Sequence, residues 1–239
     1  MNATIRIDEV IFNSYPTFRR GIVIATQLQN QGHSESLENT LNEVISQASV
    51  HPIDLKTDPR ITDWDEAHRQ FGSNFNKFIP AHRNLLKRVQ KSGTSIPFIN
   101  KVVAIMNINS IRDVIPVGRD DLASAGTLLE LRYSNGNERF TPIGLPETIE
   151  NPDVGEVIYV AAESGEVMCR RWNWRNGHKT RITETTQVIV MNIDALGENS
   201  EDRAITTRNS VAQMLAKFCN AQVQTTLLSP ENPFYKLEN

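Results

Sequence analysis

Residues 169–181 read CRRWNWRNGHKTR, and the interpretation of both fold and function depends on them. The stretch holds five Lys or Arg, one His and two of the three tryptophans, and it has no carboxylate. The whole chain of 239 residues carries 25 basic and 28 acidic side chains, for a net charge of −3. The cations are therefore concentrated locally, and a protein coated with basic charge for nucleic acid is excluded.

Residues 166–174, EVMCRRWNW, are predicted to form a strand, on which successive side chains point to opposite faces. One face would hold Arg170, Trp172 and Trp174, and the other Arg171, Asn173 and Arg175. The guanidinium forks could bind phosphate or carboxylate, and the indoles could stack on nucleobases. Alternatively, the tryptophans could be core residues, with the arginines paired to carboxylates such as Glu156 and Glu166. The residue types alone leave both interpretations open.

A second polar cluster, NINSIRDVIPVGRDDL, occupies residues 107–122. Its polar side chains include Asn107, Asn109, Ser110, Arg119, Asp120 and Asp121. A helix is predicted to end here and to lead into a proline–glycine turn, whose N–H groups and acids could contact a polar ligand. A plain loop with helix caps would have the same composition.

Other titratable side chains receive simpler predictions. His68 and His82 are predicted to be satisfied or half-buried helix histidines. Cys169 and Cys219 lie 50 residues apart, lack metal-site spacing and are predicted to be structural thiols. Glu184 could anchor an amino or hydroxyl group, or could equally be a surface acid.

The flanking sequence predicts an α+β protein, with helices mainly in the first half packed on a largely antiparallel sheet in the second. The predicted helices are 34–48, 62–72, 81–89, 98–107 and 208–219, and the predicted strands are 5–11, 21–28, 127–134, 138–144, 155–161, 166–174, 187–193 and 223–228. The turns NGN at 135–137 and ESGE at 163–166 are predicted to connect hairpins.

Several function classes can be set aside. The sequence has no GxxxxGK[ST] loop, no GxGxxG, no HExxH, no CxxC and no GxSxG elbow. We therefore expect no cofactor and no metal. The N-terminus lacks the pattern of a signal peptide, and no segment is apolar enough to span a membrane, so a cytoplasmic protein is expected.

A string of motifs in fixed order surrounds the opening stretch. These are PFINKVVAIMNINS, IPVGRDDL, LLELR, NGNERFTPIG, GEVIYV, CRRWNWR and TRITETTQVIV. Together they resemble the B3/B4 domain, which forms the editing module of the phenylalanyl-tRNA synthetase β subunit. The resemblance covers about residues 58–195 and, more loosely, the rest. It implies a single B3/B4-like domain over residues 1–239.

The resemblance implies a trans-acting deacylase that binds the 3′ end of mischarged tRNA and hydrolyses the aminoacyl ester, without a hydrolase triad. The resemblance also implies that the binding site includes Asn100, Asn107, the Pro116–Val117–Gly118 turn, Asp121, Arg132 and Thr183–Glu184. The full candidate set for substrate binding is Asn100, Asn107, Ser110, Gly118, Asp121, Arg132, Arg170, Arg171, Trp172, Asn173, Trp174, Arg175, Thr183 and Glu184. No catalytic group is assigned.

One position departs from the family pattern. In the synthetase module a histidine implicated in the site stands two residues after the turn's proline, and here that position is Gly118. The pocket is therefore expected to be rebuilt between residues 169–181 and 107–121, and tyrosine specificity does not transfer. The alternatives are a non-catalytic module for a tRNA end or a small amino-acid-like ligand, and an enzyme that acts on a small acid. Neither DNA nor a membrane is an expected partner.

Overall fold

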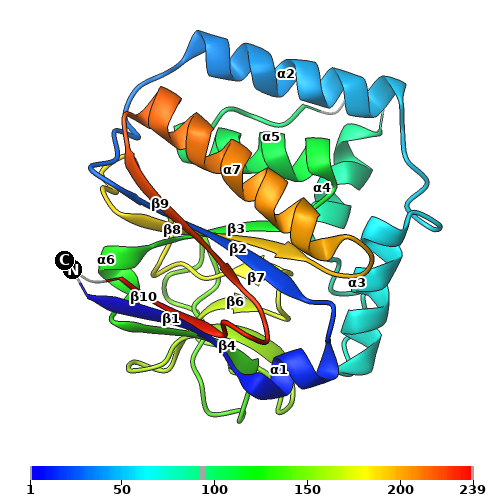
Figure 1. Ribbon diagram of the computed structural model, residues 1–239, viewed down its shortest axis with the longest axis vertical. Helices are drawn as coiled ribbons and strands as arrows, with labels where there is room; N and C mark the ends of the chain where they lie inside the picture. Colours follow the sequence, from blue (N-terminus) through cyan, green and yellow to red (C-terminus); the bar gives the residue numbers. More distant parts are fainter. Residues whose placement is uncertain (1, 92–94, 238–239) are drawn as a thin grey trace.

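The structure is a computed structural model, and it describes residues 2–91 and 95–237. Within these residues, helices cover one face of a four-stranded sheet, and a six-stranded sheet packs against its other face (Figure 1). The predicted α+β class is confirmed. The strands, however, form two sheets rather than one.

The predicted helices are present, with shifted ends. The helices are α1 (Glu9–Ser14), α2 (Glu35–Val50), α3 (Pro59–Gln70), α4 (Ala81–Val89), α5 (Lys101–Asp113), α6 (Leu122–Ala125) and α7 (Ser200–Cys219). The α2 helix begins at the predicted cap, where Ser34 Oγ accepts a hydrogen bond from the Leu37 amide. None of the helices in residues 2–91 and 95–237 is long and apolar enough to cross a membrane.

The strands pair mostly antiparallel. They are β1 (Ala3–Ile7), β2 (Arg19–Thr26), β3 (Val117–Asp121), β4 (Leu128–Tyr133), β5 (Val157–Ala161), β6 (Glu166–Arg170), β7 (Arg175–Asn176), β8 (Ile189–Ala195), β9 (Gln222–Leu228) and β10 (Phe234–Leu237). The six-stranded sheet has the order β10-β1-β4-β5-β6-β7, and the four-stranded sheet has the order β3-β8-β2-β9. Only the β1–β4 pair among these is parallel.

The β2 strand is buried on both faces, which explains its continuous apolar run. Val23 and Ala25 belong to the core beneath the helices, where α7 packs on the four-stranded sheet. Ile22 and Ile24 belong to the core between the two sheets. Alternation along one strand thus places β2 in both cores.

Two predicted strands are wrong in part. The strand predicted for residues 5–11 ends at Ile7, because Asp8 caps α1 by accepting a hydrogen bond from the Val10 amide. The segment 138–144 forms only isolated bridges, and it contains Pro142, which cannot donate to a strand ladder. The NGN turn therefore connects no hairpin, whereas ESGE does connect β5 to β6.

The strand predicted for residues 166–174 ends at Arg170, which corrects the predicted alternation of faces. The Arg171 and Trp172 backbones have φ of 45° and 63°, in the left-handed region. The chain reverses over residues 171–174, and Arg175 then pairs with Arg170 across the β6–β7 hairpin. We call these four residues the 171–174 turn.

Candidate functional site

A small, partly open cavity lies where the two sheets meet the 171–174 turn. We call it the inner cavity; its volume is about 50 Å³, room for a few water molecules. Its lining residues are Arg20, Ala81, Pro116, Val117, Gly118, Asp120, Tyr159, Cys169, Trp172, Asn173, Trp174, Asn176, Asn192 and Asp194. Strands of both sheets, the start of α4 and the turn therefore contribute to one polar site.

A second hollow adjoins the inner cavity on the helical side, and we call it the outer groove. Its volume is about 180 Å³, and its lining comes mainly from α4 and α5. Ala81, Val117 and Trp174 line both spaces. The two spaces therefore adjoin, with the half-buried Trp174 between them.

A buried ion pair forms one wall of the inner cavity. Arg20 Nε and Nη2 donate to the two carboxylate oxygens of Asp194 at 2.6 and 2.7 Å. Trp172 Nε1 donates to Asp194 Oδ2 at 3.2 Å. The pair bridges β2 and β8, and the Arg20 guanidinium lies 4.8 Å from the centre of the Tyr159 ring. This two-pronged geometry fixes the orientation of both charges.

Polar atoms around the inner cavity have unused hydrogen-bonding capacity. Within residues 2–91 and 95–237, Arg20 Nη1, Tyr159 Oη, Asn192 Oδ1 and Asn173 Nδ2 are buried and make no hydrogen bond of regular geometry. Tyr159 Oη lies beside the Asn192 side chain, and burial raises its pKa. Each buried polar atom without a partner costs roughly 1–3 kcal/mol, so a polar ligand or ordered water is expected to satisfy them.

Among the residues that line the inner cavity, Asp120 has a carboxyl group with a strongly raised pKa. Burial raises its pKa to about 7, although Thr180 Oγ1 donates to it at 2.6 Å and the Arg119 charge lowers its pKa. A carboxyl group with a pKa near 7 can both accept and return a proton at neutral pH. Asp120 is therefore a candidate general base.

A histidine from α3 orients the amide of the turn. His68 Nε2 and Asn173 Oδ1 are 3.0 Å apart, so the ring donates, and the buried Asn173 amide nitrogen has no hydrogen-bond partner among the described residues. Burial lowers the pKa of His68 to about 4, which keeps the ring neutral. The Asn173 carbonyl also accepts from the Ala81 amide at 2.8 Å, which ties the turn to α4.

The arginines of the opening stretch hold the turn rather than face the cavity. Arg170 donates to both oxygens of Glu156, at 2.9 and 2.7 Å, and to Glu150 at 3.0 Å. Arg171 pairs with Asp153, and its guanidinium lies 3.8 Å from the centre of the Phe78 ring. The alternative in which the arginines pair with carboxylates therefore describes these two residues.

Trp172 is a core residue that also reaches the cavity. Its ring is 2% exposed and makes edge contacts with Tyr15, Phe18 and Trp64 at centroid distances of 4.8, 5.0 and 5.1 Å. Its Nε1 bond to Asp194 connects this aromatic cluster to the buried ion pair. The two tryptophans thus differ, because Trp174 stays half-buried at the groove.

Six of the fourteen candidate residues line the inner cavity or the outer groove, namely Asn107, Ser110, Gly118, Trp172, Asn173 and Trp174. The others line neither space, and they are Asn100, Asp121, Arg132, Arg170, Arg171, Arg175, Thr183 and Glu184.

Besides Arg170 and Arg171, which hold the turn, three more of these eight have clear structural roles. Asn100 caps α5 by accepting from the Val103 amide at 3.0 Å. Asp121 caps α6 and accepts from Thr186 Oγ1 at 2.8 Å. Arg132 donates to Glu138 at 2.5 Å. Arg175 reaches Glu150, whereas Glu184 is exposed.

The candidate set omitted the charged and polar residues contributed by the strands, namely Arg20, Asp120, Tyr159, Asn192 and Asp194. Among these, Asp120 alone belongs to a cluster identified in the sequence, as one of the acids of residues 107–122. Arg20, Asn192 and Asp194 stand within the apolar runs RRGIVIAT and IVMNIDA, which form buried strands. A polar side chain in such a run must find a partner, and this was the available indication.

The sequence matches the family model described as the B3/4 domain over residues 63–227, which is well over half of the chain. The chain belongs to the B3/4 domain family. The resemblance predicted from the motifs is confirmed, and the match extends past residue 195. Arg20 precedes the matched region, whereas the rest of the inner-cavity lining of this B3/4 protein lies within it.

One similar solved structure is an N-terminal fragment of the phenylalanyl-tRNA synthetase beta-subunit from Pyrococcus horikoshii. The two chains share 12% identity, with a TM-score of 0.48. The alignment covers 93% of this chain and 50% of that chain, so the B3/4 protein spans about half its length. The comparison with curated proteins gave no match.

Proposed function

We propose that this B3/4 protein binds the aminoacylated 3′ end of tRNA and hydrolyses the ester as a deacylase acting in trans. The aminoacyl group enters the inner cavity, and the terminal adenosine lies in the outer groove. The observation that carries the proposal is that four residues lining the inner cavity, Arg20, Tyr159, Asn173 and Asn192, hold buried polar atoms with unused hydrogen-bonding capacity, beside a carboxyl group with a pKa near 7. The motif resemblance to the synthetase editing module suggests the substrate class.

The polar groups of the inner cavity match those of an aminoacyl ester. Arg20 Nη1 and Asn173 Nδ2 are donors suited to the ester carbonyl oxygen and to the oxyanion that forms from it. Asp194 accepts three hydrogen bonds and retains acceptor capacity for an α-ammonium group. Tyr159 Oη and Asn192 Oδ1 remain for a polar side chain of the substrate.

The size of the inner cavity limits the aminoacyl group. About 50 Å³ suits a small side chain and excludes an aromatic one without rearrangement. Trp172 and Tyr159, which are almost fully buried, form part of the wall. We therefore propose small polar amino acids as the preferred aminoacyl groups.

Asp120 supports hydrolysis as a general base. Its carboxylate accepts a proton from a water molecule as the water oxygen bonds to the ester carbonyl carbon. Collapse of the tetrahedral intermediate breaks the bond to the ribose oxygen, which receives the proton back from Asp120. The products are the free amino acid and the deacylated tRNA, and this reaction scheme includes no metal or nucleotide.

The outer groove offers contacts for the terminal adenosine. Trp174 presents a half-buried indole for base stacking, and Asn107 and Ser110 present polar side chains. Arg88 alone is basic among the described residues that line this groove. We therefore expect few phosphate contacts and a shallow dependence of binding on salt.

The proposal is tested with a panel of tRNAs mischarged with small and large amino acids, by following loss of the amino acid with time. Wild type should hydrolyse one or a few of the small species. Asp120→Asn should lose most of this activity, about 100-fold or more. The matched control is Asp63→Asn, because burial also raises the pKa of Asp63, which lines neither space. Hydrolysis that survives in Asp120→Asn at the wild-type rate would refute the assignment.

A second candidate is a non-catalytic binder of a free small amino acid, favoured by the small volume of the inner cavity and the single basic side chain among the described residues of the groove. Calorimetric titration with free amino acids distinguishes the two. Tight binding of one amino acid without hydrolysis of any tRNA in the panel would establish this second function instead.

A further inference from the structure

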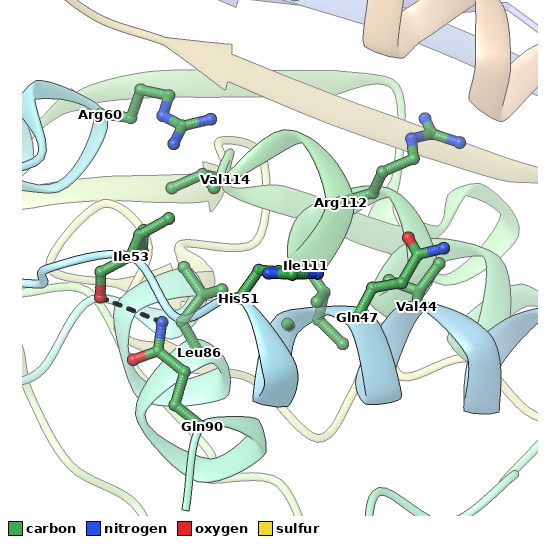
Figure 2. A pocket seen from close by; sticks show the side chains of 11 residues that line it. Val44, Gln47, His51, Ile53, Arg60, Leu86, Gln90, Ile111, Arg112 and Val114 are labelled. Atoms are coloured by element: carbon green, nitrogen blue, oxygen red, sulfur yellow. Dashed lines mark hydrogen bonds between the residues drawn. The ribbon is translucent and has the colours of Figure 1, made fainter.

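A larger pocket lies among the helices and shares no lining residue with the inner cavity or the outer groove. It is bounded by α2, α4, α5 and the start of α3, and we call it the helical pocket (Figure 2). Its volume is about 410 Å³, within the range of small-molecule sites. The deacylase proposal makes no use of it.

The helical pocket has an apolar floor and a polar rim. The floor is formed by Val44, Ala48, Ile53, Leu86, Ile111 and Val114. The rim is formed by Gln47, His51, Arg60, Gln90 and Arg112. None of these eleven described residues is acidic, although the chain as a whole is slightly acidic. The lining therefore suits an apolar group that carries a negative charge.

The two arginines of the rim are held in place by neighbours outside the pocket lining. Arg60 Nε and Nη2 donate to Asp58 at 2.9 and 2.6 Å. Arg112 Nε and Nη2 donate to Asp113, both at 2.8 Å, and Nη2 also reaches Asn109 and Ser210. The Nη1 atoms of Arg60 and Arg112 make no hydrogen bond to the described residues. One edge of each guanidinium therefore remains open.

The same two arginines line an adjoining hollow of about 360 Å³, to which Arg203 also contributes. Burial and the Arg60 charge lower the pKa of Arg203, because Arg203 lies close to Arg60 where the two hollows adjoin. Asp58, Asp63 and Asp113 act in the opposite direction on Arg203, and Asp113 and Asp202 line the adjoining hollow, whereas the described lining of the helical pocket itself holds no acid.

The remaining rim groups favour the same class of ligand. Gln90 Nε2 donates to the Ile53 carbonyl at 3.2 Å, which fixes one wall of the pocket (Figure 2). Gln47 and His51, at the end of α2, are exposed and can donate to an anion. Figure 2 shows Arg60 and Arg112 on one side of the pocket and Gln90 on the other.

We propose that the helical pocket is a second binding site, for a small organic anion with an apolar body. The anionic group, a carboxylate or a phosphate ester, binds the open edges of Arg60 and Arg112 and the adjacent rim. The apolar body lies on the floor over Ala48, Leu86 and Ile111.

Fluorine-observed NMR titrations of the whole protein with 4-fluorobenzoate, 4-fluorophenyl phosphate and 4-fluorobenzyl alcohol test the proposal. At least one of the two anions should bind with a dissociation constant of about 1 mM or tighter, and the neutral alcohol should bind about tenfold more weakly or not at all. Comparison of the two anions distinguishes a carboxylate site from a phosphate site. Equal binding of the alcohol, or no binding of either anion, would overturn the proposal.

Variants locate the binding. Arg60→Gln and Arg112→Gln should each weaken anion binding about tenfold. Ala48→Leu, which fills the floor without changing charge, should abolish it. The matched control is Arg69→Gln, because Arg69 is also on α3 and pairs with Glu66 but lies outside the pocket. With folding verified by thermal unfolding, unchanged binding in Ala48→Leu and in both arginine variants contradicts the assignment.

Discussion

Burial decides the protonation state of the side chains at the candidate site. Asp120 is held with a pKa near 7, whereas burial lowers the pKa of His68 to about 4 and that of His82 to about 3. In each case the main cause is the loss of hydration of the charged form. The stability of the protein should therefore depend on pH through a small number of residues.

The Asp120→Asn variant should be more stable than wild type, increasingly so as pH rises. The folded pKa of Asp120 lies above its unfolded value of 3.8, so its stabilising contribution is present below pH 3.8 and is lost as pH rises through 7. Between pH 5 and pH 8 the advantage of the variant should grow by roughly 2–3 kcal/mol. Urea unfolding at the two pH values measures it, and an equal difference at both would contradict the raised pKa.

His68 and His82 should make the protein sensitive to acid. Their folded pKa values lie below the ordinary value of 6.5, so the stability they contribute is present above pH 6.5 and is lost as pH falls toward 4 and 3. Each should cost roughly 2 kcal/mol between pH 6.5 and pH 5. Urea unfolding of wild type and His68→Gln over this range checks the slope, which should be shallower in the variant. An unchanged slope would show that His68 already binds a proton in the folded state.

At the scale of elements, the 171–174 turn depends on one buried carboxylate. Glu156 accepts two hydrogen bonds from Arg170 and one from the Arg171 amide, at 2.9, 2.7 and 3.1 Å. These bonds offset the left-handed backbone of Arg171 and Trp172. The sequence pattern could not predict the turn, because the partner that stabilises it lies just before β5, 14 residues earlier in the chain.

Glu156→Gln should therefore destabilise the protein by about 3–5 kcal/mol, since it leaves the Arg170 charge buried with weakened pairing. Chemical denaturation measures the loss. The control is Glu147→Gln, an exposed acid of the preceding loop, which should change stability by less than about 0.5 kcal/mol. A small effect of Glu156→Gln would mean that the turn is held by other contacts.

Two glycines of the four-stranded sheet, Gly21 on β2 and Gly118 on β3, should respond differently to a methyl group. A Cβ at Gly21 would lie 2.9 Å from Arg208 Cβ and 3.0 Å from the Ala204 carbonyl oxygen, so Gly21→Ala should push α7 from β2 and cost about 1–3 kcal/mol. A Cβ at Gly118 would approach nothing closer than 3.8 Å. Gly118→Ala should therefore fold normally but narrow the inner cavity, which it lines. Thermal unfolding and deacylation assays separate the two effects, and equal loss of stability in both variants would refute the comparison.

At the scale of the whole molecule, the site exists because two sheets meet. Periodicity predicted the α+β class and most helices, since those patterns are local. It did not predict that β2 lies between β8 and β9, or that β1 pairs with β4 and β10. The Arg20–Asp194 pair depends on that β2–β8 register, so no local pattern could identify it. The motif resemblance indicated Gly118 and Asn107, because fixed motif order carries information about distant neighbours.

The most direct test of the account is the enzyme-dependent rate of deacylation between pH 5 and pH 9, measured on the best mischarged tRNA under single-turnover conditions with spontaneous hydrolysis subtracted. The account predicts that the wild-type rate rises through a pKa near 7 and then levels, as Asp120 becomes ionised. Asp120→Asn should show a low rate without this transition. A wild-type profile that Asp120→Asn reproduces, or no enzyme-dependent hydrolysis of any tRNA tested, would contradict the inner cavity as the site of deacylation.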